Sequence, residues 1–119
     1  MHVLILESDA EFREHLAGRL ARLGHEVVGA EDAEEALSRC HRQGLAVVLV
    51  GLHQGGLDAR TFLGRVPQVC PEARVICINH PKDVALSIEA MKLGVVDEVH
   101  PPVDMEDLDR RIRAVGGGA

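Results

Sequence analysis

Three histidines are the side chains whose type and position in this sequence first suggest chemistry. His53, His80 and His100 each lie just after a short run of β-branched and aliphatic residues. If those runs are parallel strands, the three histidines and Glu7 lie at one edge of a sheet. Imidazoles with a carboxylate suit zinc, nickel or copper. Histidines in loops are more often exposed side chains without a ligand, so we expect no bound metal and name these three as the metal-ligand candidates.

The polar residues near the same predicted edge have simpler interpretations. Glu7 and Asp9 follow the first apolar run, directly before a stretch with helical periodicity. We expect Glu7 to be a solvated carboxylate. Asp9 is expected to cap the first helix, because aspartate side chains accept hydrogen bonds from the free N–H groups of a helix start. Asn79 is expected to satisfy backbone groups of its loop.

The apolar runs recur regularly along the chain. Their length and continuity predict strands that are covered on both faces. The five predicted strands are His2 to Leu6, His25 to Ala30, Leu45 to Val50, Arg74 to Ile78 and Val95 to Val99.

Segments with helical periodicity lie between these strands. Phe12, Leu16 and Leu20 share one face of the first segment. Asp32 with Glu35 forms a capping-box pattern at the start of the second. The predicted helices are Glu11 to Leu23, a stretch from Asp32 that ends before Gly44, Ala59 to Val66, Asp83 to Leu93, and Asp104 to Val115.

Five successive strand and helix units predict an α/β fold with a five-stranded parallel sheet, doubly wound, and helices on both faces. Ligand sites in such sheets lie at the carboxyl ends of the strands. With 119 residues, 46% of them hydrophobic, the chain is long enough for one domain and too short for two. We assign residues 1–115 to this domain and expect residues 116–119 to be a flexible Gly-rich tail.

Composition narrows the classes of function. No apolar run approaches the roughly 20 residues that span a bilayer, and the N-terminus lacks signal-peptide features, so we expect a cytoplasmic protein without membrane contact. The formal charge of −6 argues against nucleic-acid binding by this domain. Cys40, Cys70 and Cys77 lack metal-site spacing, and no disulfide framework is expected. We also predict that the chain is not an enzyme, because it has no activated nucleophile, phosphate-binding loop or acid and base pair.

Three segments of the chain match one known pattern. They are the run Val3-Leu4-Ile5-Leu6-Glu7-Ser8-Asp9, the loop from Leu52 to Leu57, and the helix end Ala90-Met91-Lys92-Leu93-Gly94. With Pro102, they resemble the response-regulator receiver domain of two-component signalling. The resemblance extends from Val3 to about Val115. It implies a (βα)5 fold of the flavodoxin or CheY-like type, with strand order 2-1-3-4-5.

The positions that carry receiver chemistry depart from the family pattern. Glu7 keeps the first of two acidic residues that hold magnesium, but Ser8 replaces the second. Gly51 replaces the aspartate that accepts the phosphoryl group, and Pro101 replaces the lysine that contacts it. Phosphoryl transfer needs an anionic nucleophile, a hard cation and a positive donor, and losing one electrostatic stabiliser costs about a hundredfold to a thousandfold in rate. We therefore expect no phosphorylation at residue 51.

The positions of the receiver switch also differ. In the family, phosphorylation is coupled to a Thr or Ser and to an aromatic residue of the fifth strand. The resemblance places Asn79 and Glu98 at these two positions. A ligand shifts a conformational equilibrium only by binding two states unequally. Without the phosphoryl contacts, we expect one conformational state with or without a phosphodonor.

A second resemblance concerns the segment Gly51-Leu52-His53-Gln54-Gly55-Gly56. It is similar to the Asp-x-His-x-x-Gly motif of cobalamin-binding domains, whose histidine ligates cobalt. Gly51 stands where that motif has the aspartate that orients the histidine, and the motif belongs after the first strand instead of the third. We interpret the match as coincidence and expect no cofactor.

The helix from Asp83 to Leu93 has more apolar surface than a surface helix needs. Receivers commonly dimerise or bind partners through this helix, the fifth strand and the fifth helix. We therefore expect a protein partner or a homodimer through residues 83–115, with unusually deep burial of the helix as the alternative. The residues named for this interaction surface are Leu86, Ala90 and Leu93, while Val84, Ile88 and Met91 lie on another side of the helix.

Together these features predict a receiver-like signalling domain that works without phosphorylation and acts through protein interaction. One alternative is a conventional phosphorelay role with an unrecognised acceptor. The other is a small metal- or cofactor-binding flavodoxin-like module that uses His53, His80 and His100.

Overall fold

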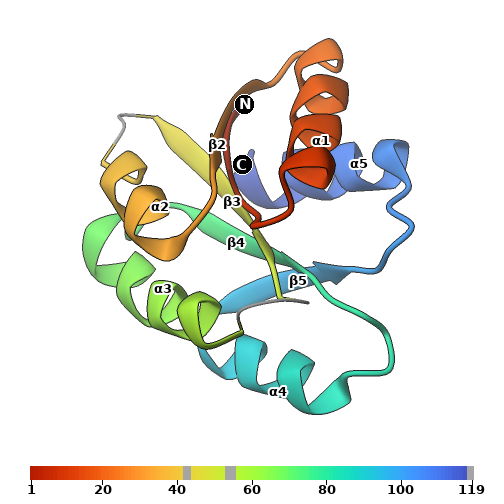
Figure 1. Cartoon of the computed structure of the whole chain (residues 1–119). Coiled ribbons are helices and arrows are strands. Elements are labelled where there is room, and N and C mark those ends of the chain that lie inside the picture. Colours follow the sequence, from red (N-terminus) through yellow and green to blue (C-terminus); the bar gives the residue numbers. More distant parts are fainter. Residues whose placement is uncertain (42–43, 53–55, 118–119) are drawn as a thin grey trace.

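The computed structural model describes residues 1–41, 44–52 and 56–117, and the side chains of residues 56–58 lie outside the description. Strands and helices alternate along these residues (Figure 1). None of the described helices is both long enough and apolar enough to cross a membrane. The strands are β1 (His2–Leu6), β2 (Glu26–Ala30), β3 (Leu45–Gly51), β4 (Arg74–Ile78) and β5 (Val95–Val99). The helices are α1 (Ala10–Arg22), α2 (Ala33–Arg39), α3 (Gly56–Val69), α4 (Val84–Lys92) and α5 (Met105–Gly116).

The strands form one parallel sheet in the order β2-β1-β3-β4-β5. The predicted fold class and strand order are therefore confirmed. Helices α1 and α5 pack on one face of the sheet, and α2, α3 and α4 cover the other (Figure 1). Because all strands point the same way, the loops that follow them leave from one side of the sheet, here called the carboxyl edge.

The position of β3 in the middle of the sheet explains why its sequence is an unbroken aliphatic run. Val48 and Val50 pack among the residues beneath α2, α3 and α4, while Val47 and Leu49 pack beneath α1 and α5. All four side chains are fully buried. A parallel strand that is covered on both faces needs an apolar residue at every position. The burial of β3 therefore fixes its place in the middle of the sheet.

Side-chain caps and glycines set the helix boundaries close to the predicted ones. Four helices begin after an aspartate whose carboxylate accepts a hydrogen bond from a first-turn N–H group. These aspartates are Asp9, Asp32, Asp83 and Asp104. Three turns have a positive φ, which glycine adopts without the steric cost of a side chain. They lie at Gly24 (φ 96°), Gly44 (φ 84°) and Gly94 (φ 104°).

The third helix is longer than predicted. The helix was predicted from Ala59 to Val66, whereas α3 runs from Gly56 to Val69 and includes Gly64. A glycine inside a helix costs about 1 kcal/mol relative to alanine. Complete burial of Phe62 and Val66 against the sheet outweighs that cost, since burying one large apolar side chain contributes about 1.5–3 kcal/mol.

A buried histidine ties α5 to the start of β2. The His25 side chain is fully covered, and its Nε2–H donates to Oδ1 of Asp109 at 2.6 Å. Nε of Arg113 donates to the same oxygen at 2.9 Å, and Nη2 of Arg113 donates to the backbone carbonyl of Leu23 at 2.7 Å. The hydrogen bond from His25, together with the contacts of Arg113, lowers the pKa of Asp109 despite its partial burial. The carboxylate of Asp109 thus joins two parts of the chain that are distant in sequence.

Replacing Asp109 with asparagine is expected to reduce the free energy of unfolding by about 1–2 kcal/mol at neutral pH, because two donors lose a charged acceptor. A lowered pKa in the folded state means that the stabilisation is present above the ordinary pKa of 3.8 and is lost as the pH falls through the folded-state value. The difference between wild type and Asp109→Asn should therefore shrink below about pH 4. Denaturant titrations at a series of pH values measure it.

Asp107→Asn is the matched control for that experiment. Asp107 lies on the same helix but pairs with Arg110 and Arg111 at the surface. Surface ion pairs contribute little to stability, so the control should change the free energy of unfolding much less. A loss in Asp109→Asn that stays constant across the acid range would contradict the role of the charged carboxylate.

Candidate functional site

The carboxyl edge collects most of the residues that the sequence singled out. Glu7 follows β1, Gly51 ends β3, Asn79 follows β4 and His100 follows β5. Parallel pairing brings all of these positions to the same side of the sheet, as predicted. His53 lies outside the described residues, so its predicted position is not tested.

The acidic residues after β1 are organised differently from the prediction. Glu7 was expected to be solvated, but it is only 2% exposed, and its Oε2 accepts a hydrogen bond from the N–H of Asp9 at 2.9 Å. Asp9 caps α1, as predicted, by accepting from the N–H of Phe12 at 3.1 Å. Ser8 between them is exposed. The two carboxylates therefore serve the turn into α1. The expectation that Glu7 is solvated is wrong, because its side chain is buried and accepts a backbone hydrogen bond from that turn.

Gly51, the residue expected from the sequence to stand at the phosphoacceptor position, provides backbone atoms only. Gly51 is the last residue of β3 and pairs with Ile78 of β4. The next N–H group, that of Leu52, donates to the Ile78 carbonyl at 2.9 Å. Pro101 is exposed and precedes a cis peptide bond to Pro102. Gly51 has no side chain, and the side chain of Pro101 is an uncharged hydrocarbon ring.

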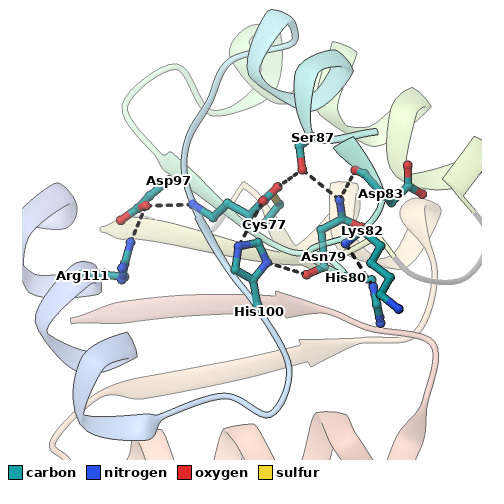
Figure 2. A network of polar contacts seen from close by, with 10 residues as sticks. Cys77, Asn79, His80, Lys82, Asp83, Ser87, Asp97, His100 and Arg111 are labelled. Atoms are coloured by element: carbon teal, nitrogen blue, oxygen red, sulfur yellow. Dashed lines mark hydrogen bonds and ion pairs between the residues drawn. The ribbon is translucent and has the colours of Figure 1, made fainter. Parts of the chain in front are cut away.

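A polar network occupies the end of β4 (Figure 2). Asn79 is only 1% exposed, and its side-chain amide donates two hydrogen bonds, each of 3.0 Å. One goes to the carbonyl of Asp83, which caps α4, and the other goes to Oγ of Ser87 in the first turns of α4. The expectation that Asn79 satisfies loop backbone groups is thus confirmed, and the same amide also contacts a helix side chain.

The carboxylate of Glu98 extends this network to β5. Its Oε1 accepts from Oγ of Ser87 at 2.5 Å and from Sγ of Cys77 at 3.4 Å. Burial, followed by the charge and hydrogen bond of Glu98, raises the pKa of the Cys77 thiol to about 12. Cys77 therefore stays protonated near neutral pH and acts as a hydrogen-bond donor. It is a poor nucleophile in this form, because only the thiolate is an effective nucleophile.

His100 completes the network from the far end of β5 (Figure 2). Its Nδ1 lies 2.9 Å from the backbone carbonyl of Asn79, and its Nε2 lies 3.6 Å from Oε2 of Glu98. Asp97, which precedes Glu98 on β5, instead faces α5, where it accepts a hydrogen bond from Arg111 at 2.7 Å. Asp97 and Glu98 thus bind α5 and α4, which lie on opposite faces of the sheet.

Sequence reasoning placed Asn79 and Glu98 at switch positions but missed Ser87, which joins them. A signal was present in the sequence. Two adjacent acids in a short strand that is otherwise valine need polar partners on both faces of the sheet. Ser87 lies one turn after the cap Asp83 and is therefore well placed to be one of them.

The three-histidine metal hypothesis gains no support from the described residues. Among them, no group of three or more histidine, cysteine, aspartate or glutamate side chains is arranged to hold a metal ion. Nδ1 of His80 accepts a hydrogen bond from the N–H of Lys82, and both ring nitrogens of His100 face other polar atoms. Because His53 lies outside the described residues, the complete set stays a prediction.

The exposed apolar surface of α4 is not formed by the residues predicted for the interaction surface, Leu86, Ala90 and Leu93. Ala90 is buried, and Leu86 and Leu93 are partly buried against the core beneath α2, α3 and α4, so this part of the prediction is wrong. Helical periodicity identified two apolar sides but not which one faces the sheet. The exposed side consists of Val84 (60% exposed), Ile88 (50%) and Met91 (59%), here called the α4 patch.

The comparisons with known proteins agree with the geometry. The chain matches the model of the response regulator receiver domain over residues 3–113. It is 35% identical over 119 residues to a probable transcriptional regulator, ycf27, of Guillardia theta, and 33% identical over 118 residues to the two-component response regulator PhoP of Pseudomonas aeruginosa. These matches cover 95% and 97% of this chain but 44% and 51% of the relatives, so the chain spans about half of their length.

Among solved structures, the fold is similar to a response regulator receiver domain protein from Clostridium thermocellum. The TM-score is 0.87 at 22% sequence identity, over 98% of this chain and 94% of that chain. The family model covers nearly every described residue, and receiver domains of this family are signalling modules and not enzymes. The chain belongs to the response regulator receiver domains of two-component signalling.

Proposed function

We propose that this domain is a pseudo-receiver, which takes no phosphoryl group at residue 51 and signals through contact with another protein. The observation that carries the proposal is the identity of three residues at the carboxyl edge. Gly51 offers no nucleophile, Ser8 offers no carboxylate for magnesium, and Pro101 offers no cation. Each of these groups has a separate role in phosphoryl transfer, so the loss of all three removes the reaction.

The polar network supports a single resting state. Asn79, Ser87 and Glu98 connect β4, α4 and β5 by hydrogen bonds within the protein. A phosphoryl group at residue 51 could shift the equilibrium between two arrangements of these elements only if it bound one arrangement better than the other. The chain has no charged group at residues 51 or 101 to make such a contact.

The α4 patch supports protein interaction as the output. Its three members lie three or four residues apart on α4 and are each at least half exposed, so they form one apolar stripe. Val96 on β5 is also 51% exposed. Contiguous exposed apolar residues are typical of interaction surfaces. We propose that a second copy of the chain or another signalling protein covers this patch.

Incubation with acetyl phosphate and magnesium should leave the mass of the wild-type protein unchanged, because no nucleophile is available at residue 51. Beryllofluoride, which mimics the phosphoryl group, should leave the amide spectrum unchanged. Gly51→Asp alone should also fail to react, since Ser8 and Pro101 still provide neither the metal ligand nor the cation. Intact mass spectrometry and amide NMR measure these outcomes.

The matched control for that experiment is a triple variant, Ser8→Asp with Gly51→Asp and Pro101→Lys. It supplies all three missing groups on the same fold, so it tests whether the chemistry was lost through these positions. A hydroxylamine-sensitive phosphoryl adduct on the wild-type protein would overturn the proposal. Asp9 and Asp58 would then be the first candidate acceptors, in line with a conventional phosphorelay role.

Replacing Ile88 with glutamate should weaken self-association through the α4 patch by at least about fivefold, as expected for a residue at the centre of an interface. Because Ile88 is half exposed, the change in folding stability should stay within about 0.5 kcal/mol. Sedimentation velocity over a concentration series measures the first effect, and thermal unfolding measures the second. Arg65→Glu, on an exposed position of α3, is the control. A wild-type protein that sediments as a monomer at every concentration would contradict the homodimer and leave a heterologous partner as the occupant of the patch.

A further inference from the structure

Two cysteines lie at the edge of the sheet opposite the carboxyl edge. Cys40 is the C-terminal cap of α2, and Cys70 directly follows α3. The two helices lie side by side on one face of the sheet (Figure 1). Each helix connects two parallel strands, so it returns the chain to the amino ends of the strands. The ends of both helices therefore reach the same edge, near Leu45 at the start of β3.

Cys40 and Cys70 line the same surface hollow. The hollow has a volume of about 280 Å³, and His41, Leu45 and Pro71 are among its other lining residues. Cys40 is buried, whereas Cys70 is partly exposed. A water molecule takes up about 30 Å³ in the liquid, so the hollow has room for a small solute beside the Cys70 thiol.

The backbone on both sides of the hollow is held by helical hydrogen bonds. The N–H of Cys40 donates to the carbonyl of Ala36 at 3.0 Å, and the N–H of Cys70 donates to the carbonyl of Val66 at 2.7 Å. Both cysteines pack in the core beneath α2, α3 and α4. Burial, followed by the neighbouring Cys70 thiol, raises the pKa of Cys40 to about 11. The two thiols are thus neighbours on the ends of different helices.

We propose that Cys40 and Cys70 form a dithiol site, which hydrogen peroxide oxidises to an intramolecular disulfide between the ends of α2 and α3. First, the Cys70 sulfur attacks one oxygen of the peroxide, the O–O bond breaks, and a sulfenic acid and one water form. The Cys40 sulfur then attacks the Cys70 sulfur, the S–O bond breaks, and hydroxide leaves as a second water with the proton of Cys40. The two thiols lose two hydrogen atoms, and the peroxide is reduced to two waters.

Exposure decides the order of the two steps. Oxidation of a cysteine depends on access to the oxidant as well as on thiolate character, so the partly exposed Cys70 meets the peroxide first. Cys40 is buried and has a raised pKa, which protects it from direct oxidation. It nevertheless lines the same hollow as Cys70. Cys40 is therefore the residue that resolves the sulfenic acid.

The third cysteine provides an internal contrast. Cys77 lies on β4, where its thiol donates to Glu98 and its pKa is raised to about 12. It is buried and is not among the residues that line the hollow. In sequence, however, Cys77 is nearer to Cys70 than Cys40 is. Pairing by sequence distance and pairing by the fold therefore predict different disulfides.

The disulfide acts on a different part of the molecule from the proposed protein contact. It joins α2 to α3 at the amino ends of the strands, whereas Gly51 lies at the carboxyl edge and the α4 patch lies on another helix. A disulfide forms only between cysteines whose Cα atoms come within about 7 Å of each other. The oxidised form therefore fixes the spacing of these two helix ends.

The experiment treats the folded wild-type protein with a small excess of hydrogen peroxide, alkylates the remaining thiols after denaturation, and measures the intact mass. We expect a monomer that has lost two hydrogen atoms and carries one alkyl group, on Cys77. Peptide mapping should find Cys40 joined to Cys70, and reduction before alkylation should restore three alkyl groups. Before oxidation, Cys70 of the folded protein should be alkylated at least about tenfold faster than Cys40, because Cys40 is buried.

The same chain unfolded in urea is the matched control for the fold. Loop closure costs less for a shorter loop, so oxidation of the unfolded chain should favour the disulfide between Cys70 and Cys77. In the folded protein the preference should reverse to Cys40 and Cys70. A folded protein that forms the Cys70–Cys77 disulfide would overturn the proposal.

Three variants test the role of each thiol. Cys70→Ser should abolish the loss of two hydrogen atoms, and it changes a partly exposed residue, so the result does not depend on a substitution in the core. Cys40→Ala should also abolish that loss and leave a sulfenic acid on Cys70, which dimedone traps. Cys77→Ala is the control and should form the disulfide as the wild type does. A wild-type protein that keeps all three thiols, retains oxygen atoms on Cys70 without a disulfide, or forms dimers linked through Cys70 would contradict the dithiol site.

Discussion

Burial of both faces of the parallel sheet is the constraint on which the rest of this structure depends. The aliphatic residues of β3 pack on both sides, and its backbone is paired with β1 and β4. Polar side chains on the sheet can then be accommodated only at its ends or on its edge strands. At the end of β3, Gly51 continues the backbone ladder without needing a side chain. The fold therefore does not depend on a side chain at residue 51.

Much of this architecture could be predicted because local pattern and tertiary burial agree. The predicted limits of β1, β4 and β5 coincide with the observed ones. In β1 and β4 four consecutive residues are apolar, as expected for strands in a covered sheet, and in β5 valines flank the two acids. The misses have a common physical origin in packing that a linear pattern does not contain. Periodicity could not tell that Leu86 packs against the core while Ile88 is exposed, and it did not show that Glu7 is buried. In α3, contacts of Phe62 outweigh the local preference of Gly64.

The side-chain amide of Asn79 connects the end of β4 to the start of α4 by two hydrogen bonds. The hydroxyl of a threonine or serine has one proton to donate, whereas the Asn79 amide has two in a fixed plane. It uses them for the carbonyl of Asp83 and the hydroxyl of Ser87 at the same time. Both protons of the Asn79 amide are therefore engaged with the start of α4, which fixes the end of β4 to that helix.

The attachment of α5 has a mechanical meaning for the whole sheet. Asp109 holds this helix to His25 beside β2, and Arg111 holds it to Asp97 of β5. β2 and β5 are the outermost strands on opposite sides of the sheet, so α5 connects the two margins of the sheet. Because α5 contacts both margins, a displacement of either outer strand would have to change one of these contacts of the helix.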